Sequence, residues 1–153
     1  MNRFARLEEL RRLKEETAGQ AFARSLAQIE ELRHRIVELD RMSQEEQNAA
    51  KEALAGPQRP DPALLAQFLM GQKWRRQRLE TALGKARQES EAAREVWRLA
   101  RMQLQQAETL AEKESLRLKL EQRRKENKEM DQVGIYRSSH LQDGHHQARR
   151  GTA

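Results

Sequence analysis

The chain has 153 residues, a net charge of +6 and no cysteine. Charged residues make up 35% of it, hydrophobic residues 37% and aromatic residues 4%, which is too polar for the apolar core of a compact domain of this length. The lack of cysteine excludes a disulfide framework and a thiolate zinc site. Because the apolar residues are periodic and glycine and proline are scarce, the composition favours long helices over disorder.

The first predicted element is a helix over residues 3–54. Its mostly apolar stripe recurs at steps of three and four, as expected for a helix with one packed face: Ala18, Phe22, Ser25, Ile29, Leu32, Ile36 and Leu39. All three prolines of the chain lie between Gly56 and Pro62, and proline interrupts a helix, so a loop is predicted over 55–61. Asp61 is a good N-cap, and Pro62 suits the first position of the next helix.

The second predicted helix covers residues 62–133 and carries a heptad seam. The seam alternates steps of four and three through Leu79, Leu83, Ala86, Ser90, Ala93, Trp97, Ala100, Leu104, Ala107, Ala111, Glu114 and Leu118. This repeat is typical of a left-handed coiled coil. Residues 138–153 contain Gly, Ser and His without periodicity, so we expect a disordered tail after a coiled-coil region over 1–137.

The two seams fit each other if the chain folds back at the proline loop. In an antiparallel register whose facing residue numbers sum to about 115, large residues repeatedly face small ones. The facing pairs are Ile36 with Leu79, Leu32 with Leu83, Ile29 with Ala86, Phe22 with Ala93, and Ala18 with Trp97. The sequence therefore predicts an all-α fold: a monomeric, antiparallel two-helix coiled-coil hairpin with a longer second helix and a disordered C-terminal tail. The alternative is two separate helices that pair with other chains.

The sequence contains no pattern that predicts a catalytic, cofactor or metal site. The glycines are isolated rather than grouped in a phosphate-binding loop. His34 stands alone in the first helix, and the tail histidines lack a metal-ligand spacing. A two-helix hairpin also offers no pocket that would desolvate an acid or a base. We therefore expect no enzyme activity, no cofactor and no small-molecule substrate.

Two groups of residues near the loop are candidates for partner binding. The stretch from Leu64 to Met70, which includes Leu65 and Phe68, is apolar, whereas the facing stretch 43–50 is polar. Such an apolar excess often marks a contact site, although burial by the loop or by self-association is the alternative. Trp74 lies off the seam among basic residues, Lys73, Arg75, Arg76 and Arg78. One turn of helix is weak support for nucleic-acid binding, so a protein partner is favoured and no nucleic acid is expected.

A third candidate is the part of the second helix that lacks a mate. The register places Phe4 near Ala111, so residues from about 113 onward have no partner within the chain. This part is highly charged and nearly balanced, and a lone charged helix is marginal in water without a partner. Its basic residues Arg123, Arg124, Lys125 and Lys128 are the predicted contacts.

The second half of the chain resembles a known family. Glu95-Val96-Trp97-Arg98 is similar to the family's tryptophan-containing helix, and the run from Glu121 to Asp131 is similar to its basic closing tract. Phe68 after the proline loop is a further similarity. On these residues the chain resembles FliJ, a small component of the bacterial flagellar type III export apparatus, over about residues 1–137. Gln132 departs from the family, which commonly has an acidic residue there.

The resemblance implies a fold and a role. The fold is a two-helix antiparallel coiled coil similar to the central stalk of rotary ATPases. The role is a non-enzymatic stalk and adaptor that enters the hexameric export ATPase, couples it to the export gate protein FlhA, and handles export chaperones. The implied location is the cytoplasm, at the inner face of the cell membrane through the export apparatus. Alternatives are a virulence-type secretion stalk, a self-assembling structural coiled coil, and a basic protein that binds nucleic acid or membrane surfaces.

Overall fold

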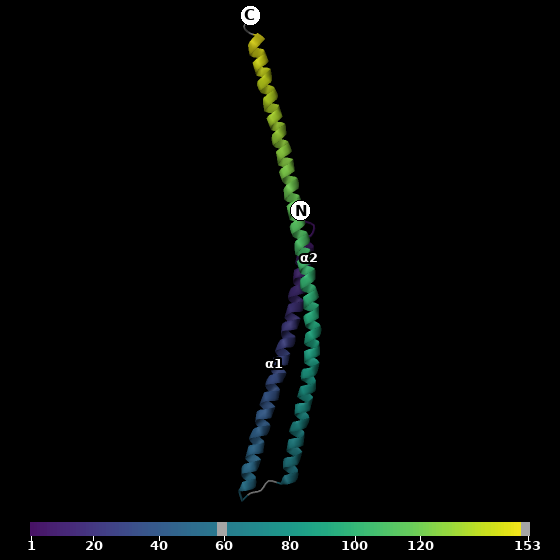
Figure 1. Cartoon of the computed structure of the whole chain (residues 1–153), viewed down its shortest axis with the longest axis vertical. Helices are drawn as coiled ribbons and strands as arrows, with labels where there is room; N and C mark the ends of the chain where they lie inside the picture. The colour runs from purple at the N-terminus through teal and green to yellow at the C-terminus, as the bar shows by residue number, and fades with distance from the viewer. Residues whose placement is uncertain (58–60, 151–153) are drawn as a thin grey trace. The chain divides into compact units, whose positions relative to one another are not determined.

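The computed structural model describes residues 1–57 and 61–150, with side chains described as far as Gly144. Within these residues the chain forms two helices, α1 over Ala5–Ala55 and α2 over Pro62–Arg150, and no strand (Figure 1). The all-α, two-helix fold with a longer second helix is thereby confirmed. The chain divides into two units: Arg11–Leu104, which contains the hairpin, and Met1–Leu10 together with Gln105–Ala153.

The start of α2 follows the capping signal in the sequence. The Oδ1 atom of Asp61 accepts a hydrogen bond of 3.0 Å from the backbone N–H of Ala63, and the Asp61 carbonyl accepts one of 3.1 Å from Leu65 N–H. The first bond satisfies a donor that the first turn of a helix leaves free, and the second is the first backbone bond of the helix itself. Pro62 has no N–H to satisfy. The first helix stops at Ala55, directly before Gly56 and Pro57.

In the hairpin unit the two helices pack in the predicted register. Ile29, Leu32, Leu83 and Ala86 form one buried cluster, against which Ile36, Leu79 and Ala82 pack. Polar contacts agree with this register, since Arg76 Nε lies 2.7 Å from Asp40 Oδ1 and Arg11 donates to Gln103 at 2.5 Å. Burial of apolar surface in these layers stabilises the packing of the two helices. The ion pair between Arg76 and Asp40 adds little stability because it is exposed.

Trp97 packs more broadly than its predicted place beside Ala18. Its ring stacks on Phe22, with centroids 5.6 Å apart, and its Nε1 donates a hydrogen bond of 2.9 Å to Glu15. A Cβ at Gly19 would lie 3.1 Å from Nε1, so the glycine gives the indole room. Together with buried Ala18, these residues have the i, i+3, i+4, i+7 spacing of a hole that receives a coiled-coil knob.

The loop end of the hairpin has few buried side chains. Between Arg33 and Ala82, Gln72 is the one buried residue among those described, and its Oε1 atom has no hydrogen-bond partner there. An amide oxygen that is buried without a partner costs stability. We infer that the helices are held together chiefly by the layers from Ala18 to Leu32 of α1 and the residues facing them.

In the second unit, the N-terminal residues pack against α2 through small and polar side chains. Ala107, Ala111 and Glu114 are buried. Half-buried residues extend to Leu118, so the contact continues a turn beyond the predicted limit near residue 113. Asn2 and Arg3, which precede α1, contribute to this contact through Ala111 and Glu114.

The end of α2 differs from the prediction. The helix was expected to stop near residue 133, but it continues to Arg150. No proline occurs after Pro62, and an isolated Gly134 costs only about 1 kcal/mol relative to Ala, so no strong stop signal is present. The separation of residues 138–153 as a tail stays a prediction, and residues 151–153 lie outside the described part. None of the helices in the described residues is long and apolar enough to span a membrane.

Candidate functional site

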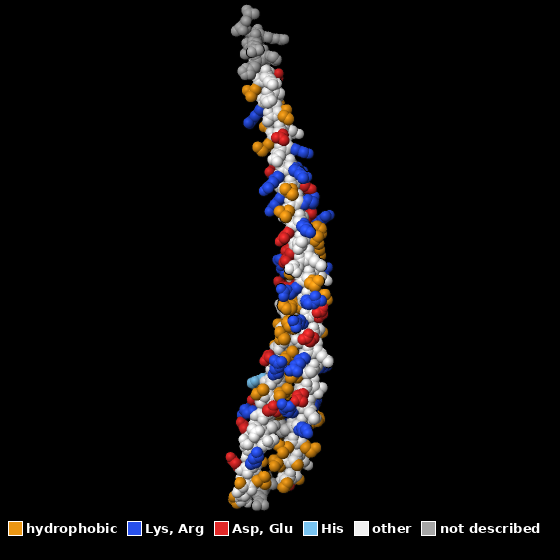
Figure 2. All heavy atoms as spheres, viewed as in Figure 1, with side chains coloured by type: hydrophobic (Ala, Val, Ile, Leu, Met, Phe, Trp, Pro, Cys, Tyr) orange, Lys and Arg blue, Asp and Glu red, His pale blue; other side chains and the backbone are white. Residues whose placement is uncertain are grey.

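The first candidate surface lies at the loop end of the hairpin, where apolar side chains gather on the start of α2 (Figure 2). Phe68 is 37% exposed, and Leu64 and Met70 are more exposed still, whereas Leu65 is half-buried. Facing residues of α1 are short or polar, so they cannot cover these side chains. The apolar surface expected from the sequence is therefore present, with Phe68 at its partly covered edge.

Trp74 belongs to a separate groove between the two helices. The groove has a volume of about 710 Å³ and is lined by Leu32, His34, Arg35, Glu38, Leu39 and Met42 of α1 and by Trp74, Arg75, Arg78, Leu79 and Ala82 of α2. Trp74 is 57% exposed and Met42 is 48% exposed. Neither Phe68 nor Leu65 lines this groove, so Trp74 and the loop-end surface are separate sites in the structure, as they were separate candidates in the sequence.

Around the groove, the positive charges that lack a partner outweigh the negative ones. Arg78 lies over the Trp74 ring, with its guanidinium carbon 4.7 Å from the ring centroid. Neither Arg75 nor Arg78 forms an ion pair with any residue the structure describes. The single carboxylate of the lining, Glu38, is bonded to Arg41, which lowers the pKa of Glu38. The groove therefore presents free cations and an already neutralised anion.

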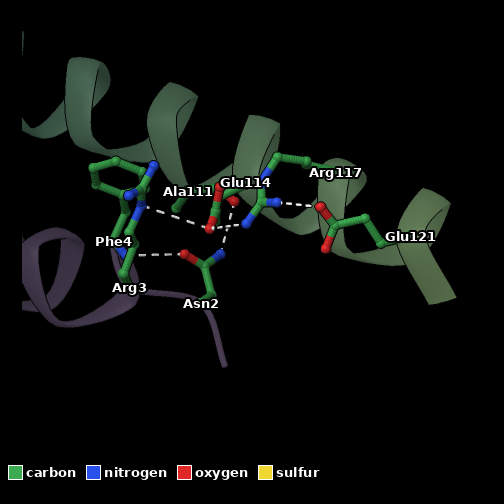
Figure 3. A network of polar contacts seen from close by, with 7 residues as sticks. All are labelled: Asn2, Arg3, Phe4, Ala111, Glu114, Arg117 and Glu121. Carbon is green, nitrogen blue, oxygen red and sulfur yellow. Dashed lines mark hydrogen bonds and ion pairs between the residues drawn. The ribbon is translucent and has the colours of Figure 1, made fainter.

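The third candidate surface begins where the N-terminus contacts α2 (Figure 3). Asn2 joins the two segments, because its Nδ2 donates a hydrogen bond of 2.8 Å to the carbonyl of Ala111 while its Oδ1 accepts one of 3.0 Å from Phe4 N–H. The second bond caps the start of α1. The Nε atom of Arg3 lies 3.6 Å from Oε1 of Glu114, which makes them an ion pair. The same short segment thus starts α1 and fixes its end to α2.

Glu114 is the centre of this network. It is 6% exposed and accepts two hydrogen bonds from Arg117, of 2.9 and 3.0 Å. These bonds are the main reason that the pKa of Glu114 is lowered, with further contributions from the charges of Arg117, Arg3 and the N-terminus. Arg117 also pairs with Glu121 on its other side. A carboxylate in a seam position is therefore held charged by residues at the base of the exposed helix.

Beyond this network α2 is exposed along its length. Every residue from Lys119 to Gly144 is exposed, which at 1.5 Å per residue corresponds to about 40 Å of helix. None of the four predicted contacts Arg123, Arg124, Lys125 and Lys128 forms an ion pair with a described residue. At about 100° per residue, Arg124, Lys125 and Lys128 share one face, whereas Arg123 lies on another.

Sequence reasoning found the α2 residues of these surfaces but missed those of α1. Met42 and Leu39 line the groove, and Asn2 and Arg3 form the network, yet none was a candidate. The predicted register could have identified the α1 side of the groove, because it places residues 34–42 opposite residues 73–81. No comparable signal marked Asn2, whose role depends on the path of the chain before α1.

The described side chains form surfaces that can bind other molecules. No group of three or more His, Asp or Glu side chains among the described residues could hold a metal ion. The carboxyl groups whose pKa is lowered, Glu38 and Glu114 among them, are paired with arginines, which keeps these carboxylates ionised. What the chain offers to other molecules is an apolar surface, a cationic groove and an exposed charged helix.

Comparison with known proteins places the chain in a family. The model of the family described as Flagellar FliJ protein matches residues 1–142. No curated protein and no solved structure matches the chain. The matched range includes the loop-end surface, the groove, the network around Glu114 and the four basic residues of the exposed helix.

Proposed function

Because the chain belongs to the FliJ family of flagellar proteins, a family of export-related stalk proteins, we propose that it is a non-enzymatic stalk and adaptor of the flagellar export apparatus. Its exposed α2 segment, together with the N-terminus of α1, enters the hexameric export ATPase. Its hairpin binds the export gate protein FlhA and handles export chaperones. It works in the cytoplasm, associated with the inner face of the membrane through these partners.

One observation carries the ATPase contact: α2 extends far beyond its pairing with α1, and the described basic side chains of this exposed part, from Lys119 onward, form no ion pair with a described residue. A lone charged helix gains from an external surface that covers it, since side-chain pairs alone stabilise it weakly. The bonds of Asn2 and Arg3 to α2 support a joint role for the N-terminus. Acidic groups lining the ATPase ring would match Arg124, Lys125 and Lys128.

The gate contact is supported by the loop-end surface. Phe68 and Leu65 belong to an apolar stretch that α1 leaves partly uncovered. Aromatic and aliphatic side chains that are partly exposed on a rigid helix are typical anchors of protein interfaces. We assign Leu65, Phe68 and Trp74 to protein partners of the hairpin, with Phe68 as the anchor for the gate.

The ATPase contact is tested by replacing Arg123, Arg124, Lys125 and Lys128 with Glu. Each exposed charge pair contributes only about 0–1 kcal/mol, so the four must be changed together. We expect the variant to lose its stimulation of the ATPase, because charge reversal turns attraction into repulsion. We also expect stimulation by the unchanged chain to fall with added salt, since the contacts are screened.

The matched control reverses four exposed basic residues of the hairpin unit, Lys51, Lys85, Arg87 and Arg94. It changes the net charge equally and should leave stimulation intact, while both variants keep the thermal melt of the unchanged chain. Normal stimulation by the first variant, or equal loss in both, would show that the exposed segment is not the contact.

A further inference from the structure

The groove at Trp74 combines an apolar floor with an exposed aromatic wall. Leu32 is 9% exposed, and Leu39 and Leu79 are half-buried beside it. Above them stand Trp74 and Met42, one from each helix, both about half exposed. Tryptophan and methionine are enriched in protein interfaces, because they supply large contact areas and Met adapts its shape. The floor and walls fit an apolar side chain that enters from outside.

The rim of the groove favours an acidic occupant. Arg75 and Arg78 form no ion pair with a described residue, and Arg78 is already placed over Trp74. Arg35 pairs with Glu31, and Glu38 with Arg41, so these neighbours largely neutralise one another. Two arginines therefore remain whose charges are uncompensated. Arginine forms paired hydrogen bonds to carboxylates, which makes a carboxylate-bearing partner the complementary one.

The shape of the groove favours a helix. It follows α1 from Leu32 to Met42, a length of about 15 Å, which is about three helical turns. A third helix laid between two paired helices can use one apolar face for the floor and place charged residues at both edges. Nucleic acid fits less well, since it favours a continuous basic stripe and stacking platforms.

We propose that this groove is the docking site for an acidic amphipathic helix of a partner protein. The partner's apolar face packs between Trp74 and Met42, and its carboxylates pair with Arg75 and Arg78. The inference rests on the proposed function only in assigning Trp74 to a protein partner. It is independent of the contacts of the exposed α2 segment and of Phe68.

The probe is a hydrocarbon-stapled peptide of about three turns with leucines on one face and glutamates along its edges, since an unstapled helix of that length is marginal. Its fluorescence anisotropy is measured on titration with the full chain. We expect a Kd of about 10–100 µM for such a small contact, and no binding of the same peptide with lysine in place of glutamate.

Two variants locate the contact. Trp74→Ala and the double variant Arg75→Glu, Arg78→Glu should each weaken binding about tenfold or more, since aromatic and arginine anchors dominate small interfaces. The control double variant Lys85→Glu, Arg87→Glu makes the same charge change on another exposed part of α2 and should bind normally. Melting curves confirm that all of the variants fold.

Four results would overturn the proposal. The first is absence of binding by the glutamate peptide, and the second is equal binding of the glutamate and lysine peptides. The third is a Trp74→Ala chain that binds as tightly as the unchanged one. Tighter binding of a single-stranded RNA that is lost in the Arg75, Arg78 variant would assign the groove to nucleic acid instead. None of these results bears on ATPase stimulation by the exposed segment, so the two proposals fail separately.

Discussion

Replacing Trp97 with Ala is expected to lower the free energy of unfolding by about 2–4 kcal/mol, somewhat less than for a fully buried tryptophan. The change removes the stack on Phe22, the hydrogen bond to Glu15 and the contact of Arg101, whose guanidinium carbon lies 5.0 Å from the indole centroid. It also leaves the space beside Gly19 empty. Thermal and urea unfolding, followed by circular dichroism at 222 nm, measure the effect.

The second tryptophan provides the control. Trp74 is 57% exposed, so Trp74→Ala should change stability by less than about 0.5 kcal/mol. Trp97→Phe should recover part of the loss, because a phenyl ring can still stack on Phe22 but cannot donate to Glu15. Equal melting of the Trp97→Ala and Trp74→Ala chains would contradict the packing described for Trp97.

Replacing Leu83 with Ala is expected to cost about 2–4 kcal/mol. Leu83 is 9% exposed and belongs to the cluster with Ile29, Leu32 and Ala86. Since Ala86 and Ala82 are already small, the neighbours on α2 cannot fill the space that the leucine leaves. Urea unfolding should show a lower midpoint with a similar slope.

The matched control is Leu64→Ala, which removes the same atoms from a side chain that is 65% exposed. It should leave the free energy of unfolding within about 0.5 kcal/mol of the unchanged value. If the Leu83→Ala and Leu64→Ala chains had the same unfolding midpoint, the Ile29–Ala86 cluster would not be what holds the hairpin together.

The hairpin could be predicted because its signals are local and repeated. Prolines between Gly56 and Pro62 separate the helices, and a seam without slips fixes which residues face one another. The pairing of Ile29 with Ala86 and of Leu32 with Leu83 follows directly from that register, and the buried cluster confirms it. A coiled coil is favourable for such reasoning, since side-chain order along two helices determines most contacts.

The stack of Trp97 on Phe22 could not be obtained from the register alone. The register sets Phe22 beside Ala93 and Trp97 beside Ala18. Helical side chains lean toward the N-terminus of their own helix, and in an antiparallel pair this brings the two rings toward each other. Large side chains therefore contact residues about one turn away from the position that facing Cα atoms would suggest.

The end of α2 and the groove were missed for different reasons. The composition after residue 137 resembles a tail, but no residue there forbids a helix, and α2 continues. The groove depends on Leu39 and Met42 of α1, whose place in it follows only when both helices are taken together in their register.

In the proposed function, the exposed α2 segment contacts the ATPase while the loop-end surface contacts the gate. It is tested most directly by site-specific photo-crosslinking with benzoyl-phenylalanine placed at Lys125 or at Phe68, in a mixture of the export ATPase and the cytoplasmic part of the gate protein. A probe at exposed Lys85 is the control. We expect crosslinks from position 125 to the ATPase and from position 68 to the gate. Crosslinks from 125 to the gate and from 68 to the ATPase would contradict it.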